Sequence, residues 1–208
     1  MSSLLTQSEC LGIALWQRDE YTSMHCARVE SLCRILGSFC DLSSHERSLL
    51  PVAAKLHDLG KIGITADVLF KDGPLDAAEW EVMKRHSELG QTACDSIPHP
   101  HARSLGIIVR HHHEAFDGSG YPDGLVGTAI PICSRIILLA DCYDAMTSAR
   151  SYRHSLAHQE AMQIMHSERG KKSDPLLFDC FARMMETRQA ARDGRTTHAS
   201  RKPLRGSA

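Results

Sequence analysis

Apolar residues recur every three to four positions along most of the chain, which is the pattern of amphipathic α-helices. The spacing predicts helices over residues 4–16, 23–39, 102–111 and 158–168, and further helices that begin near Ser43, Asp76, Pro131 and Asp174. No alternating pattern of strand type occurs. We therefore expect an all-α fold, a single-domain bundle of about seven helices joined by one long loop.

The N-terminal helix and the helix after Pro131 carry the clearest core candidates. The first offers four leucines, Leu4, Leu5, Leu11 and Leu15. The second is almost wholly apolar over residues 136–140, yet Asp141 and Asp144 follow directly. A carboxylate in so apolar a helix needs a partner, because an unpaired buried charge is costly. A metal ion would be such a partner.

Two capping boxes fix where other polar residues fall. Ser43 is followed three residues later by Glu46, and Asp76 by Glu79, which is the signature of a helix start. The helix from Ser43 then ends near Gly60, so that His57 and Asp58 project from its end. The helix from Asp76 would hold His86 in its middle.

The segment from Arg110 to Pro122 is the most unusual in the chain. Three adjacent imidazoles, His111–His113, precede a loop with four glycines between residues 114 and 130. Neutral imidazole is the commonest metal ligand among side chains, and glycine lets the backbone come close to a ligand. The segment predicts a metal site beside a substrate loop, although a solvated histidine-rich turn would look the same in isolation.

Composition and charge limit the partners and the compartment. A net charge of −1 gives no field that would favour a nucleic-acid polymer or an anionic membrane. There is no apolar run of transmembrane length and no secretory signal, and the 8 cysteines form no Cys-x-x-Cys pair. We expect a cytoplasmic protein with reduced, buried cysteines. Residues 187–208 are rich in arginine and are expected to be a disordered, solvated tail.

Five short motifs, taken together, resemble the HD-GYP family, the branch of the HD metal-dependent phosphohydrolases that acts on bacterial cyclic di-GMP. The matching pieces are residues 25–29 (His-Cys-Ala-Arg-Val), 57–63 (His-Asp-Leu-Gly-Lys-Ile-Gly), 83–86 (Met-Lys-Arg-His), 112–122 (His-His-Glu through Asp-Gly-Ser-Gly-Tyr-Pro) and 140–148 (Ala-Asp-Cys-Tyr-Asp-Ala-Met-Thr-Ser). They span nearly all of the predicted globular part. The resemblance implies an N-terminal helix over residues 1–17, a catalytic domain over 18–186 and the tail over 187–208.

The resemblance also implies a binuclear metal centre. One divalent ion would be held by His25, His57, Asp58 and Asp141, and the second by His86, His112 and His113, with Asp58 bridging both. Imidazole with carboxylate suits iron, manganese, nickel or zinc, and affinity alone does not select among them. Some family members bind a third metal through a glutamate four residues before the first histidine. Tyr21 stands there in this chain, so we expect two metals.

The activity implied is hydrolysis of cyclic di-GMP, mainly to the linear dinucleotide pGpG, by a hydroxide that the two ions share. Asp58 and Lys61 would act in catalysis, and Lys61, Arg150 and Arg153 would bind the substrate phosphates. Supporting positions in the helix after Pro131 and in the glycine loop would be Asp144, Thr147, Asp117, Gly118, Gly120, Tyr121 and Pro122. Residues 1–17 are too few for a regulatory domain, so we expect regulatory proteins to act in trans.

Two other functions fit the same residues. The chain could be a metal-loaded cyclic-dinucleotide receptor or interaction module with little turnover. It could also be an HD phosphohydrolase that acts on a nucleoside monophosphate or an alarmone, although the Gly-Tyr-Pro loop argues against this. The sequence does not decide the oligomeric state.

Overall fold

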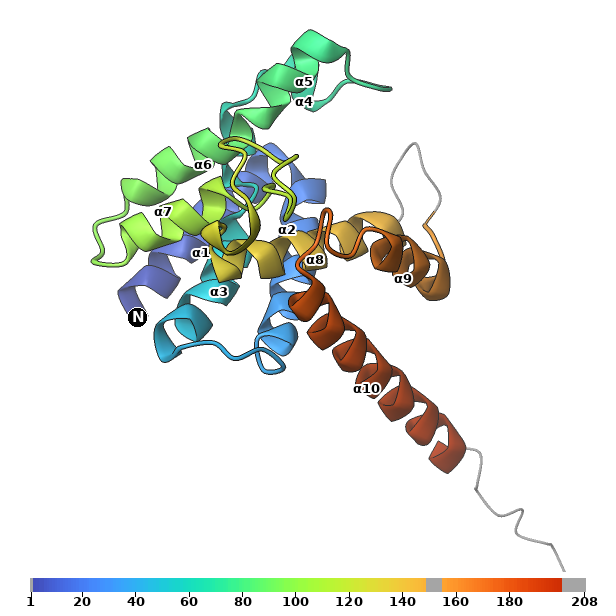
Figure 1. Cartoon of the computed structure of the whole chain (residues 1–208). Coiled ribbons are helices and arrows are strands. Elements are labelled where there is room, and N and C mark those ends of the chain that lie inside the picture. Colours follow the sequence, from blue (N-terminus) through green and yellow to red (C-terminus); the bar gives the residue numbers. More distant parts are fainter. Residues whose placement is uncertain (1, 149–154, 200–208) are drawn as a thin grey trace, which may run out of the picture.

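The most apolar segment of the chain forms α8 (Ile132–Thr147), which lies in the middle of the helical bundle (Figure 1). Its residues 136–140 are all buried, and it packs against α2, α3, α7, α9 and α10. A helix that is apolar on every side is stable only when it is enclosed in this way. Because Asp141 and Asp144 lie on α8, the enclosure also carries two carboxylates into the interior.

The computed structural model describes the backbone of residues 2–148 and 155–199. Its helices, in chain order, are α1 (Ser2–Arg18), α2 (Glu20–Leu36), α3 (Ser44–Leu56), the 3₁₀ helix η1 (Leu59–Gly63), α4 (Ala66–Leu69), α5 (Ala77–Lys84), α6 (His86–Asp95), α7 (Ala102–Arg110), the 3₁₀ helix η2 (Gly127–Ala129), α8 (Ile132–Thr147), α9 (His158–Ser167) and α10 (Pro175–Ala199). Within these ranges the only β-type pairing is the isolated bridge between Arg169 and Ser173. The all-α prediction is therefore confirmed.

Both predicted capping boxes are present. The Ser43 hydroxyl accepts from the backbone N–H of Glu46 at 3.2 Å, and the Glu46 carboxylate accepts from the N–H of Ser43 at 2.8 Å. Asp76 and Glu79 form the same reciprocal pair at the start of α5. These caps satisfy backbone donors that the first turn of a helix leaves without partners. They set the starting points of α3 and α5, and hence the approximate positions of the histidines that follow.

The position predicted for His86 is wrong. His86 is the first residue of α6, since the helix pattern breaks at Arg85 between α5 and α6. The break lies against η1, where a Cβ on Gly60 would be 1.9 Å from the carbonyl oxygen of His86. The spacing of apolar residues contains no information about this backbone contact between distant segments. It therefore predicts one continuous helix where the structure has α5 and α6.

Three further expectations differ from the structure. The split between α5 and α6 and the short α4 give more helices in the described residues than the seven or so predicted. Leu5 is 47% exposed and does not belong to the core, whereas Leu4 and Leu15 are buried. The predicted disordered tail begins inside α10, which continues to Ala199 and projects away from the bundle (Figure 1). Alanine, arginine and glutamine are good helix formers, and they outweigh the polarity on which the prediction rested.

The segment between α7 and α8 folds back over the end of α7. The N–H of Tyr121 donates to the carbonyl of His113 at 3.2 Å, and the peptide bond between Tyr121 and Pro122 is cis. A Cβ on Gly120 would lie 2.1 Å from the backbone nitrogen of Ala115, so no larger residue fits there. The loop is fixed from outside as well, because Phe116 and Asp117 donate backbone hydrogen bonds to residues 171–172 before α10.

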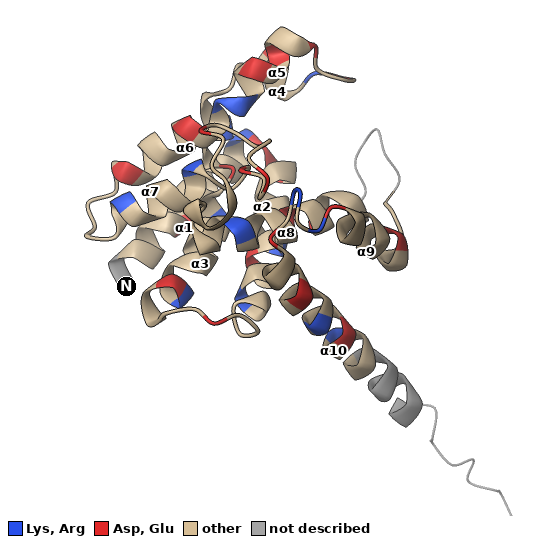
Figure 2. Cartoon of the chain, in the orientation of Figure 1, with Lys and Arg blue, Asp and Glu red and all other residues tan. Residues whose placement is uncertain are grey.

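Charged side chains of both signs are interspersed along the helices (Figure 2). This agrees with the net charge of −1 of the whole chain. In the part of the chain that the structure describes, no helix combines the length and the apolar character needed to cross a bilayer.

The contact at Gly60 leads to a stability prediction. Gly60→Ala should lower the free energy of unfolding by about 1–3 kcal/mol or more, because η1 must move away from the start of α6. Gly12→Ala is the control: its Cβ would meet only the flexible end of Lys55 at 3.2 Å. That helical substitution should be neutral or stabilising by about 0.5–1 kcal/mol. Urea unfolding of both variants measures the difference, and equal effects would contradict the tight contact.

Candidate metal centre

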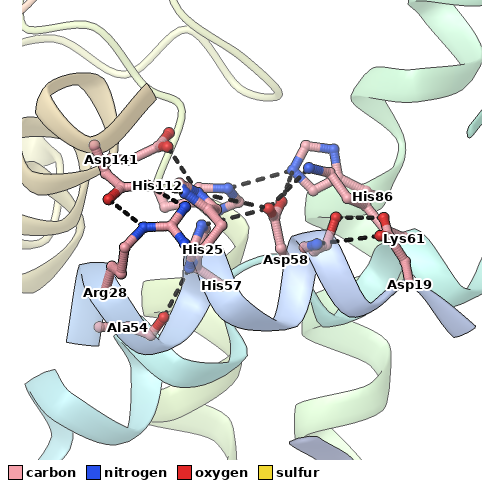
Figure 3. Close-up of polar contacts among 12 residues, drawn as sticks. Asp19, His25, Arg28, Ala54, His57, Asp58, Lys61, His86, His112 and Asp141 are labelled. Carbon is pink, nitrogen blue, oxygen red and sulfur yellow. Dashed lines mark hydrogen bonds and ion pairs between the residues drawn. The ribbon is translucent and has the colours of Figure 1, made fainter. Parts of the chain in front are cut away.

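Five segments that are distant in the sequence bring their polar side chains to one place in the interior (Figure 3). His25 comes from α2, the pair His57–Asp58 follows α3, and His86 opens α6. His112 and His113 follow α7, and Asp141 lies on α8. His25, His57, Asp58, His86 and His112 are at most 4% exposed. The seven residues that the family resemblance pointed to therefore lie together.

The ligand atoms form two groups that share Asp58. One group contains His25, His57 and Asp58, the other contains Asp58, His86, His112 and His113, and in each group the potential ligand atoms lie within 4.8 Å of one another. Asp58 Oδ2 is 3.5 Å from His57 Nε2 and 3.9 Å from His25 Nε2, whereas Oδ1 is 3.4 Å from His86 Nε2. The two oxygens of one carboxylate thus face different groups, as in a bridging ligand.

Asp141, on α8, lies next to a histidine of each group. Asp141 Oδ1 is 3.1 Å from His25 Nε2, and Oδ2 is 4.0 Å from His113 Nδ1. The ring of His113 lies against His112, with centroids 3.9 Å apart, and against Tyr121, with centroids 4.8 Å apart. Asp141 therefore touches both groups, although it is closer to the group that contains His25.

Three of the histidines are fixed from behind in the same manner. Nδ1 of His57, His86 and His112 lies 2.7, 2.8 and 2.5 Å from the carbonyl oxygen three residues earlier, on Ala54, Met83 and Val109. A carbonyl oxygen can only accept, so each Nδ1 carries the hydrogen and each Nε2 presents a lone pair to the cluster. Metal-binding histidines are held in this way in proteins generally.

The lone pairs on Nε2 lack the partners that buried polar atoms need. His57 Nε2 is buried and has no hydrogen-bond partner among the described residues. His86 Nε2 and His112 Nε2 face each other at 3.3 Å, an arrangement that is repulsive when both nitrogens present lone pairs. A cation in each group would satisfy these nitrogens, one beside His57 and one between His86 and His112, so the residues present fit divalent metal ions bound by nitrogen and oxygen.

The protonation states agree with this fit for four of the five histidines. Burial lowers the pKa of His57 and lowers that of His86 to about 4. Burial likewise brings the pKa of His112 well below its usual value and that of His113 to about 3. These imidazoles are neutral at pH 7 and ready to act as ligands. Burial would raise the pKa of Asp58, but the adjacent Lys61 ammonium is foremost among the charges that hold it well below the usual range.

His25 differs because it lies between carboxylates. Burial would lower its pKa, but hydrogen bonds to Asp141 and Asp144 raise it to about 9. Its Nδ1 is 2.7 Å from Asp144 Oδ2, and Asp144 in turn accepts two hydrogen bonds from Arg28, at 2.7 and 2.9 Å. Asp144 and Arg28 therefore orient the imidazole, and a metal would have to replace the proton on His25 Nε2.

Lys61 and Tyr121, two of the predicted functional residues, border the cluster. Lys61 Nζ donates to Asp58 Oδ2 at 2.8 Å and its side chain is 23% exposed, so that it connects the carboxylate with solvent. The Tyr121 ring lies over His113, and Trp80 and Lys84 approach it with a centroid distance of 6.2 Å and an Nζ-to-centroid distance of 5.9 Å, respectively. The cluster is thus bordered by an ammonium group at Asp58 and, at His113, by the half-buried Tyr121 ring next to the exposed Trp80.

The remaining predicted residues are placed as follows. Thr147 donates to the carbonyl of Tyr143 at 2.8 Å, and Asp117 accepts from the N–H and hydroxyl of Ser119 at 2.9 and 2.6 Å. Neither contacts a ligand residue in these bonds. Gly118 has a φ of +87° and, with Gly120 and Pro122, shapes the loop. Arg150 and Arg153 lie outside the described residues.

The sequence reasoning gave no role to Glu114 or to Asp123. Glu114 is fully buried and accepts from the N–H groups of Asp123 and Leu125 at 2.7 and 3.1 Å, so it anchors the loop from inside. Asp123 accepts two hydrogen bonds from Arg110, both at 2.7 Å, and lies 2.8 Å from His111 Nε2. His111 is thus part of the loop anchor rather than of the cluster. Only the carboxylate directly after the three histidines could have hinted at this role.

Comparison with known proteins gives consistent matches. The model of the HD domain family matches residues 10–177. A cyclic di-GMP phosphodiesterase response regulator, RpfG of Xanthomonas campestris, is 38% identical over 83% of this chain and 46% of its own length. A 3′3′-cGAMP-specific phosphodiesterase of Vibrio cholerae is 34% identical over 81% of this chain and 32% of its own length. The chain therefore spans less than half the length of these two relatives.

A solved structure also resembles this fold. The HDG"Y"P protein of Bdellovibrio bacteriovorus superposes with a TM-score of 0.64 and 18% sequence identity, over 81% of this chain and 53% of that one. At this level of identity the likeness concerns the fold.

The geometry predicts which substitution removes metal. His57→Ala should abolish tight binding of a divalent ion at the group that contains His25, because it deletes a buried ligand candidate whose Nε2 forms no hydrogen bond with any described residue. His45→Ala, an exposed histidine in the first turn of α3, is the matched control. Metal content of the purified variants, measured by elemental analysis alongside thermal unfolding, checks the prediction. Full metal retention in a folded His57→Ala variant would contradict it.

The raised pKa of His25 predicts a pH effect on metal binding. Below a pKa of about 9 the proton on His25 competes with the metal, so affinity should fall as the pH falls. About one proton should be released per chain at pH 7, since the other four histidines are already neutral. Titration calorimetry with Mn²⁺ in two buffers of different ionisation enthalpy measures this release. Binding without proton release would show that His25 is not a ligand.

Proposed function

The chain belongs to the HD-domain family, and we propose that it is a metal-dependent phosphodiesterase that hydrolyses cyclic di-GMP. The observation that carries the proposal is the sharing of Asp58 between two groups of imidazoles, in which His25, His57, His86 and His112 turn Nε2 toward the cluster. The relatives named as cyclic di-GMP phosphodiesterases support the choice of substrate.

The donor set suits two divalent ions, which we propose to be iron, manganese, nickel or zinc. When bound, a pair of such ions lowers the pKa of water so that hydroxide is available near neutral pH, and neutralises charge on the phosphoryl group. We assign His25, His57 and Asp141 to one ion, His86, His112 and His113 to the other, and Asp58 to both. Asp141 could also reach the second ion, since it lies 4.0 Å from His113 Nδ1.

The chain itself would supply positive charge for the phosphate. Lys61 is held 2.8 Å from Asp58 and is partly open to solvent, so its ammonium can meet a phosphoryl oxygen as charge develops there. It could also assist departure of the 3′ oxygen. Arg150 and Arg153 are proposed on the family resemblance as further phosphate ligands.

The aromatic pair of Trp80 and Tyr121 would hold a base. Trp80 is 46% exposed, and its ring centroid is 6.2 Å from that of Tyr121, which itself lies over His113. Purine bases stack on aromatic side chains with about 1–3 kcal/mol per base. A guanine stacked on this pair would place the adjacent phosphodiester beside the cluster. Binding of a single phosphodiester at two metals favours the linear dinucleotide pGpG as the main product.

The proposed location is the cytoplasm, since all eight cysteines lie in described positions and are free. Regulatory proteins that act in trans are part of the same proposal.

The second candidate is a metal-loaded receptor for a cyclic dinucleotide. A single experiment separates it from the enzyme: metal-assayed protein is incubated with cyclic di-GMP and, in parallel, with 3′3′-cGAMP, because some relatives are named as specific for the latter. Formation of pGpG from cyclic di-GMP supports the proposed enzyme. Saturable binding without product supports the receptor. Turnover of 3′3′-cGAMP alone would make 3′3′-cGAMP, rather than cyclic di-GMP, the substrate.

Substitution of Lys61 tests the role of its charge. Lys61→Met should lower kcat for cyclic di-GMP about 100-fold while the metal content is kept, because the ammonium is proposed to act on the phosphoryl group. Lys71→Met, in the connection between α4 and α5, removes an equivalent charge that is paired with Glu79 away from the cluster and should leave kcat unchanged. Steady-state kinetics with parallel metal analysis checks both. An unchanged kcat for Lys61→Met would remove Lys61 from the mechanism.

A further inference from the structure

A cavity of about 330 Å³ opens between α2, α8, α10 and the start of α9. None of the seven candidate metal ligands lines it, so it is separate from the centre described above. Its volume lies at the lower end of the range of pockets that bind small molecules. Asp144 forms part of its wall, and the same Asp144 holds His25 by a hydrogen bond of 2.7 Å.

The charges of the lining residues favour an anion. Arg28 and Asp144 largely neutralise each other through two hydrogen bonds of 2.7 and 2.9 Å. Arg188 on α10 is half-buried at the cavity and forms no ion pair with any described residue. His158 lines the same cavity and adds no negative charge. The net charge of the lining residues is therefore positive, and an anionic group would be stabilised beside Arg188.

The remaining wall is divided between polar and apolar groups. The hydroxyl-bearing residues Ser31, Thr147 and Ser148 line one part. Leu32, Met185 and Tyr143 line another, and the hydroxyl of Tyr143 is 3.0 Å from Nδ1 of His158. A bare inorganic anion would leave this apolar wall uncovered. The wall fits a flat apolar ring attached to the anionic group.

We propose that this cavity binds a small organic anion in which one phosphate or carboxylate group is joined to an apolar ring. Arg188 contacts the anionic group, and Leu32, Met185 and Tyr143 contact the ring. A ligand in the cavity affects the metal centre through Arg28 and Asp144. An anion near Arg28 weakens or strengthens the hydrogen bond between Asp144 and His25. The site is independent of which phosphodiester the protein hydrolyses.

Binding is tested by titration calorimetry on the metal-loaded full chain with three probes. Phenylphosphonate carries a phosphate-like group on a ring, benzoate carries a carboxylate on a ring, and methylphosphonate lacks the ring. Arg188→Gln should weaken binding of a ring-bearing probe about tenfold, as expected for loss of a charged hydrogen bond. Arg183→Gln is the matched control, because Arg183 lies on the same helix, contacts Cys180 and does not line the cavity.

The outcomes separate the sources of the anion. Binding of phenylphosphonate that depends on Arg188 identifies a phosphate-type ligand, and the same pattern with benzoate identifies a carboxylate-type ligand. The proposal is overturned if neither probe binds, if both arginine variants bind equally well, or if methylphosphonate binds as tightly as phenylphosphonate.

The link to the metal centre has its own measurement. The dissociation constant for Mn²⁺ should change at least about threefold when the cavity is saturated with the better probe, and by reciprocity metal should change the probe affinity by the same factor. Arg188→Gln should remove this effect, whereas Arg183→Gln should retain it. An unchanged Mn²⁺ affinity in the unsubstituted protein would overturn the link. This result does not depend on turnover of cyclic di-GMP, so it can fail or succeed separately from the proposed activity.

Discussion

Each imidazole that presents Nε2 to the cluster is held by a hydrogen bond at Nδ1. Carbonyl oxygens at the ends of α3, α5 and α7 hold His57, His86 and His112, and Asp144 holds His25. Without these bonds the rings could rotate, and their Nε2 atoms would not be held facing the cluster. The helix ends provide the carbonyls because the last turn of a helix leaves its acceptors without intrahelical partners.

This arrangement depends on helix termini that meet at one place in the bundle (Figure 3). The 3₁₀ turn η1 lies directly against the start of α6, where Gly60 leaves room for the carbonyl of His86. The helix α8 passes through the centre of the bundle and contributes both Asp141 and Asp144. Asp141 faces the cluster, whereas Asp144, one turn later, supports His25 from behind and also forms a wall of the cavity near α10. One helical turn thus separates a ligand candidate from the residue that orients it.

Much of the local structure could be predicted from the sequence. The capping residues at Ser43 and Asp76 located two helix starts, and the apolar run before Asp141 identified the central helix. The seven ligand candidates came from resemblance to a family, since no spacing along the chain shows that His25 and Asp141 face each other. Their convergence is a property of the structure, and their binding of metal stays a prediction. The roles of Glu114 and Asp123 could not be foreseen, because their partners are backbone groups and side chains of a folded loop.

The sequence by itself determined the fold class, the positions of the main helix starts and the chemical types of the groups available for a site. These follow from interactions between residues a few positions apart, such as capping bonds and the spacing of apolar side chains. Only the tertiary structure decided that the helical segment breaks at Arg85 between α5 and α6, and that Asp58 offers one oxygen to each group of histidines. The break and the shared carboxylate depend on packing between segments far apart in the chain, as at Gly60 against His86, and local patterns do not record such contacts.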